Sequence, residues 1–122
     1  MAKIDRAFVT VSLAWLIAGL LLGFHMGASG DNKFLDVHVA MLLPGFVVLT
    51  LYGVVYRLWP AMKASGLAKA QFWIANVGEL GLVAGALQIA LGGGPIVAGI
   101  GAALVIVSAG LMGFLFWTKA GP

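Results

Sequence analysis

The chain has 122 residues, of which 62% are hydrophobic and 9% are charged, and its mean hydropathy is +1.10. A soluble domain needs roughly a quarter of its residues charged to cover its surface, so water is not the main solvent here. Cysteine is absent, which excludes a disulfide scaffold, a zinc–thiolate site and thiolate-held iron. The formal charge of +3 comes from scattered residues, so no nucleic-acid partner is expected. The composition predicts an all-α integral membrane protein in contact with membrane lipid.

Four apolar stretches are each long enough to cross a bilayer, which takes about 20 helical residues. They run from about residue 7 to 27, 38 to 58, 71 to 91 and 96 to 117. None shows the alternation of apolar and polar residues that is typical of barrel strands. We therefore expect one domain, residues 1–122, with four transmembrane helices.

The basic residues predict how these helices are oriented. All but Lys33 fall on one side of the expected membrane, namely Lys3, Arg6, Arg57, Lys63, Lys69 and Lys119. Because basic residues favour the cytoplasmic side, both termini are expected to be cytoplasmic. We expect the chain to lie in the inner (cytoplasmic) membrane of a bacterium.

Small residues recur at helical spacing and predict close helix packing in lipid. The first helix carries Gly19, Gly23 and Gly27, and the third carries Gly81 and Gly85. A further stripe in the fourth helix comprises Gly99, Ala103, Gly110 and Gly113.

Two histidines are expected at one depth in the membrane. His25 ends the first expected helix and His38 begins the second, so a helical hairpin places both near the same face. Neutral imidazoles there are candidate axial ligands of an iron, with one ring nitrogen free to bind metal. The alternative is that each histidine is a hydrogen-bonded residue at the level of the lipid headgroups.

The second helix carries a stripe that begins at His38. Met41 and Gly45 follow it within about 60° of one line on the helix surface. Met41 is a soft side chain that fills gaps, and Gly45 is a place where a flat macrocycle fits against the backbone. The stripe predicts a cofactor-binding face, and Pro44 beside it predicts a local break in the helical hydrogen bonding.

Glu79 is the one carboxylic acid expected at membrane depth, about 12 Å into the third helix. A functional interpretation is proton handling or cation coupling. The structural interpretation is a neutral carboxyl that is hydrogen-bonded to Asn76 or to a neighbouring helix. Both interpretations are open at this point.

The segment from Phe34 to Pro60, with His38, Gly45 and the closing run Tyr-Arg-Leu-Trp-Pro, resembles a known helix. It is similar to the second transmembrane helix of subunit I in the haem-copper oxidase superfamily, most closely the cbb3-type and nitric-oxide-reductase branch. The resemblance extends from about residue 15 to 87. It implies that His38 is an axial ligand of a haem b.

The sequence also departs from that family. Ala40 stands where small relatives often have a second histidine, and nothing matches the copper ligands, the cross-linked tyrosine or the high-spin haem ligand. A complete oxidase is therefore not expected. Subunit I of the family forms three four-helix arcs, so the resemblance implies that this chain supplies one arc to a homotrimer that mimics the large subunit.

The leading hypothesis is a haem b-binding membrane protein that acts in electron transfer or in sensing of a diatomic gas or haem. His38 and His25 would hold the iron, and an electron donor or acceptor protein would be the partner. One alternative is a small proton- or cation-coupled transporter that uses Glu79. Another is a cofactor-free accessory subunit of a membrane complex.

Overall fold

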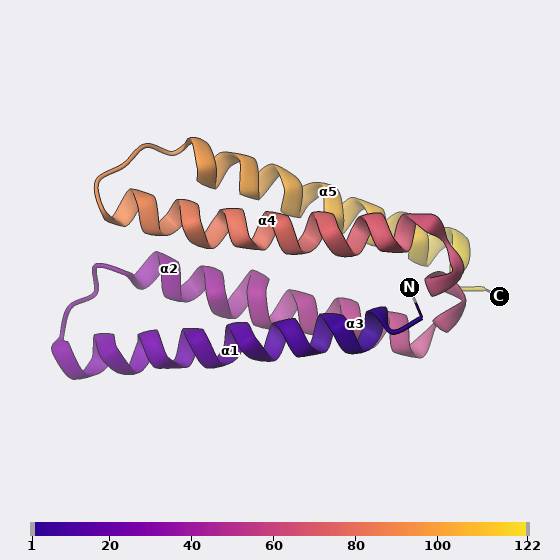
Figure 1. The fold of residues 1–122 in the computed structure, drawn as a ribbon, viewed down its shortest axis with the longest axis horizontal. Coiled ribbons are helices and arrows are strands. Elements are labelled where there is room, and N and C mark those ends of the chain that lie inside the picture. The colour runs from indigo at the N-terminus through magenta and orange to yellow at the C-terminus, as the bar shows by residue number, and fades with distance from the viewer. Residues whose placement is uncertain (1, 122) are drawn as a thin grey trace.

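A computed structural model describes residues 2–121, and all regular structure in that range is helical. The chain forms two helical hairpins that lie alongside each other (Figure 1). The elements of the first hairpin are α1 (Ile4–Ser29), α2 (Leu35–Ala40), the π-helix η1 (Met41–Val48) and α3 (Leu49–Leu58). A 3-10 turn, η2 (Pro60–Ala64), leads to the second hairpin, which consists of α4 (Gly66–Ala90) and α5 (Ile96–Lys119).

The prediction of four helices long and apolar enough to cross a membrane is confirmed, with α2, η1 and α3 counted as one continuous helix. Most helices extend past the apolar stretches. The largest difference is in α4, which begins at Gly66 because the Ser65 hydroxyl caps it by accepting a hydrogen bond from Leu67 N. The predicted break at Pro44 takes the form of the π-helix η1, since proline has no N–H to complete the α-helical pattern.

The two ends of the molecule differ in character. Both described chain ends lie beside η2 (Figure 1), and we call this the terminal end. The connections between α1 and α2 and between α4 and α5 lie at the opposite end, which we call the loop end. Trp59, Trp73 and Trp117 are near the terminal end, where they are at least one-third exposed, as residues of an interfacial belt would be.

The core is densest in the half of the molecule nearer the terminal end. Phe8 of α1 contacts the rings of Tyr52, Tyr56 and Phe72, with ring centroids 4.8 to 5.9 Å apart. These contacts join α1, α3 and α4 around one aromatic cluster. The loop-end half has fewer large buried side chains.

Glycines bring α4 and α5 into backbone contact. A Cβ at Gly85 would overlap the backbone of Ala98, and one at Gly101 would overlap the backbone of α4. The predicted packing role of Gly81 and Gly85 is therefore confirmed. Within the single chain the predicted stripe on the fourth helix does not make the contact with α4: nothing lies within 4 Å of a Cβ built on Gly99, Gly110 or Gly113, and Gly101 makes the contact instead.

Candidate functional site

His38 lies on α2 and packs against the glycine stripe of α1. Its Nδ1 lies 2.8 Å from the carbonyl oxygen of Gly19. A carbonyl only accepts hydrogen bonds, so Nδ1 carries the proton and donates it. In the neutral imidazole Nε2 then has a free lone pair. The ring fits there because Gly23 has no side chain, since a Cβ on Gly23 would lie 2.7 Å from Cε1 of His38.

His25 lies on the other side of α1 from this contact. It follows Gly23 by two residues, which corresponds to about 200° around an α-helix. The His25 side chain is exposed. A single chain thus directs the two imidazoles to opposite faces of α1. The predicted pairing of His25 with His38 at one iron is therefore not formed within one chain.

The other two predicted cofactor residues face protein rather than an open cavity. Met41 packs near Gly19, where a Cβ on the glycine would lie 3.3 Å from Cβ of Met41. Gly45 is buried, and the space beside it is filled by Glu79 and Trp15. The predicted seat for a macrocycle at Gly45 is thus already filled by these two side chains in the single chain.

Glu79 occupies the middle of α4, about 20 Å from its first residue and about 17 Å from its last. Glu79 is therefore farther from the start of its helix than predicted, because α4 begins five residues earlier than the expected span. The side chain is 1% exposed, and neither carboxyl oxygen has a hydrogen-bond partner in the described part of the chain. Asn76 instead donates from Nδ2 to the carbonyl of Phe72 at 2.8 Å. The structural interpretation, in which the carboxyl is hydrogen-bonded to Asn76 or to a neighbouring helix, is therefore not borne out among the described residues.

Asp5 is a buried polar residue that no sequence motif singles out. Its carboxylate is buried and pairs with Arg57 Nη1 at 3.0 Å and Lys63 Nζ at 3.1 Å. These contacts tie α1 to α3 and η2 at the terminal end. One feature of the sequence could have pointed to this ion pair: Asp5 is an acidic residue among the basic residues that were expected on one side of the membrane.

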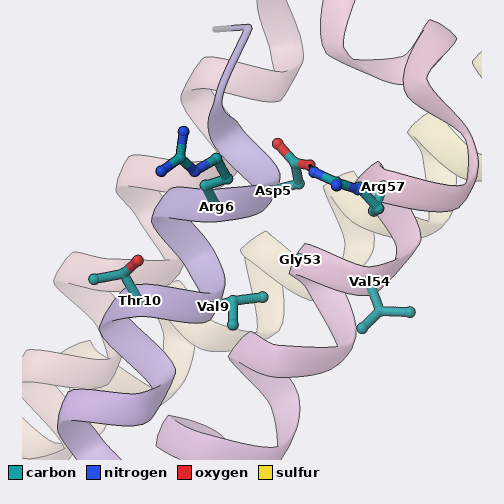
Figure 2. Close-up of a pocket in the computed structure, with 7 residues that line it drawn as sticks. All are labelled: Asp5, Arg6, Val9, Thr10, Gly53, Val54 and Arg57. Carbon is teal, nitrogen blue, oxygen red and sulfur yellow. Dashed lines mark hydrogen bonds and ion pairs between the residues drawn. The ribbon is translucent and has the colours of Figure 1, made fainter.

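A shallow pocket of about 350 Å³ lies beside this ion pair, between α1 and α3. Figure 2 shows the Asp5 carboxylate directed at Arg57, while Arg6 and Thr10 lie on the other side of α1. Gly53 forms part of the floor because a Cβ there would lie 2.7 Å from Val9. Because Asp5 neutralises Arg57 and Lys63, we interpret this ion-paired cluster as structural: it holds α1 against α3 and η2, and we call it the clasp.

Among residues 2–121, no group of three or more His, Asp or Glu side chains is placed to hold a metal ion. A metal bound by several side chains of one chain is thus without support, whereas a haem needs at most two axial ligands. Comparisons with family models, with curated proteins and with solved structures find no match. The side chains that remain as candidates for function are the half-buried imidazole of His38 and the buried carboxyl of Glu79.

Proposed function

We propose that the protein binds haem b in a membrane, with Nε2 of His38 as an axial ligand. The observation that carries this proposal is the hydrogen bond between His38 Nδ1 and the Gly19 carbonyl. A histidine that ligates metal generally donates its other ring N–H in this way, which fixes the tautomer and the ring orientation. A bound haem would supply one-electron chemistry or a site for a diatomic gas.

The residues of one chain fit this group only in part. His38 has the required donor atom, but Met41 and Gly45 face α1 and α4, and His25 faces away. The second axial ligand and the walls of the haem site would therefore come from another protomer. We propose a homotrimer with both termini in the cytoplasm of a bacterial cell, in which each protomer supplies one four-helix arc.

An absorption spectrum of the purified protein, oxidised and reduced, tests the haem proposal. Native protein expressed with haem supplied should show a Soret band, and His38→Ala should abolish it. Asn32→Ala is the control and should keep the band, because it changes an exposed side chain at the same end of the molecule that is not part of the proposed site. A native protein without the band, or a band that is unchanged in His38→Ala, would refute the proposal.

The oligomer needs a separate measurement. Native mass spectrometry from detergent or lipid nanodiscs should show three copies of the chain. Monomers or dimers alone would contradict the trimer. Co-purification of unrelated chains would favour the accessory-subunit hypothesis.

A second candidate function is proton- or cation-coupled transport through Glu79. It is favoured by the buried carboxyl without a partner at the centre of α4, because an ionisable group at membrane depth is costly to retain without a role. The test is the uptake of tetraphenylphosphonium, driven by a pH gradient, into vesicles that contain the protein. Glu79→Gln should abolish the uptake, and equal uptake by native and variant protein would refute this candidate.

A further inference from the structure

The surroundings of Glu79 contain almost nothing that binds an anion. One oxygen of its carboxyl, Oε2, occupies the space that a Cβ on Gly45 would need. Trp15 lies on the same spot, with its Cβ and Cγ each 3.1 Å from that Cβ position. The carboxyl is therefore enclosed between the backbone of η1 and an indole side chain, and glycine at position 45 makes the enclosure possible.

Charged groups lie far from this site on every element packed against it. On α1, Asp5, Arg6 and His25 are nine or ten residues from Trp15, or about 15 Å along the helix. On the continuous helix, His38 and Tyr52 are about two turns from Gly45 and Tyr56 is about three. On α5 the charged residue is Lys119, at the terminal end. An ionised carboxylate here would remain unpaired among groups that solvate a charge poorly.

The groups around Glu79 determine which cation the carboxyl can bind. Sodium, magnesium and calcium ions need several oxygen ligands, and Glu79 offers one carboxyl without a second acidic or amide group beside it. A proton needs no further ligand, and it removes the charge that the apolar surroundings penalise. The geometry therefore favours a proton over a metal cation.

A crevice lies on the loop-end side of Glu79. It has a volume of about 350 Å³ and lies between α2, η1, α4 and α5. Of the residues that line it, Lys33 and Asp36 lie nearest the loop end, and Pro44 and Leu82 lie nearest Gly45 and Glu79 along their helices. Pro44 directly precedes Gly45, and Leu82 is one helical turn from Glu79. The crevice thus ends within about 5 Å of the level of the carboxyl along α4.

The route to Glu79 from the terminal end is closed by packed side chains. Toward the terminal end, the aromatic cluster of Phe8, Tyr52, Tyr56 and Phe72 packs between α1, α3 and α4. Tyr56 donates to Oε1 of Gln71 at 3.1 Å, and Gln71 donates to the Ser108 carbonyl at 3.3 Å, which ties α5 to the same layer. Access to Glu79 is therefore asymmetric.

We propose that Glu79 is a proton-binding site that exchanges with water from the loop end through this crevice. In the forward step the carboxyl O–H bond breaks, the proton passes to a water molecule, and the electron pair stays on the carboxylate. The carboxylate then leaves its seat on Gly45 toward the water in the crevice, and η1 is the adjacent segment with irregular backbone hydrogen bonding. The inference deepens the second candidate function and shares its residue, but it requires no transport and no haem.

Infrared spectroscopy tests the proton. The chain has four acidic residues, of which Asp31 and Asp36 are exposed and Asp5 is ion-paired. Native protein at neutral pH should therefore show the carbonyl band of one protonated carboxylic acid, which Glu79→Gln removes and the control Asp36→Asn retains. A native protein without the band, or a band that persists in Glu79→Gln, would overturn the proposal. Because the native spectrum is itself decisive, the test does not depend on the variant folding.

Cysteine labelling tests the route, since the chain has no cysteine of its own. Leu82→Cys places a thiol in the crevice, and Leu80→Cys is a matched control from the same helix, on a residue that is 59% exposed on the apolar surface. A charged, water-soluble thiol reagent reacts with thiolate, which forms in water and not in lipid. Leu82→Cys should react at least about tenfold faster than Leu80→Cys. Asp31→Cys, at the loop end, shows in the same vesicles from which side the reagent has access.

The outcomes separate this proposal from the transport function. Equal rates at positions 80 and 82, or labelling of position 82 from the terminal end, would overturn the route. The infrared band together with fast labelling, but without tetraphenylphosphonium uptake, would support the proton site and refute the transporter. Loss of the Soret band in His38→Ala has no bearing on either result.

Discussion

The fit between Gly45 and Glu79 gives a quantitative prediction. Gly45→Ala adds a methyl group where Oε2 of Glu79 lies, and also 3.1 Å from two atoms of Trp15. The position is buried and helical, so the backbone accepts alanine and the effect comes from packing. Glu79 must then leave its seat, or η1 and α4 must move apart.

The magnitude follows from two opposing effects. Overpacking of a filled core costs about 1–3 kcal/mol, and replacing glycine by alanine within a helix returns about 0.5–1 kcal/mol. Gly45→Ala should therefore lower the free energy of unfolding by about 1–2 kcal/mol. In a Glu79→Ala background the carboxyl is gone, so the same change should cost at least about 1 kcal/mol less.

The assay is reversible unfolding in mixed micelles with increasing dodecyl sulfate, followed by helical circular dichroism. Four proteins form the cycle: the native chain, the two single variants and the double variant. Gly110→Ala is the matched control, because nothing lies within 4 Å of its Cβ position, and it should be neutral or stabilising. The reasoning is refuted if Gly45→Ala is tolerated as well as Gly110→Ala, or if the cycle shows no coupling.

Three further variants test other contacts. Gly23→Ala places a Cβ 2.7 Å from Cε1 of His38, so it should reduce the amount of haem bound per chain severalfold, measured by absorbance. Gly27→Ala is the control, because its Cβ meets open space, and it should leave the bound haem unchanged. Gly101→Ala drives a Cβ into the α4 backbone and should cost about 1–3 kcal/mol in the same unfolding assay. Asp5→Asn removes the charge that holds two cations and should cost about 1–3 kcal/mol, and an unchanged transition would show that the clasp contributes nothing.

The sequence predicted the helices well because one strong signal specifies them. A bilayer demands about 20 apolar residues with all backbone groups satisfied internally, so the length and composition of each stretch are decisive. Pro44 was also readable, because its missing N–H acts within its own helix. The start of α4 was missed, since the Ser65 cap extends the helix into a polar segment that hydropathy does not detect.

The partners of the buried polar groups were not predictable in the same way. A helical period shows which residues share a face, but not which helix covers that face. For Glu79 the one partner that could be named was Asn76, because it lies on the same helix, and the neighbouring helix could not be specified; the actual neighbours are Trp15 and Gly45 on two other helices. His25 and His38 were paired because they share a depth, although the rotation of α1 separates them.

The glycines explain how the side chains of His38 and Glu79 fit between the helices. In α4 and α5 they do what a stripe of small residues predicts, which is to bring two backbones together. In the first hairpin their role is different: Gly23 accommodates the His38 ring and Gly45 accommodates the Glu79 carboxyl. Each of these glycines lies on a neighbouring helix rather than on the helix of the polar residue. A glycine facing an ionisable residue across a helix interface is therefore the feature that links packing to function in this chain, and it is the contact that the coupled Gly45 and Glu79 variants measure.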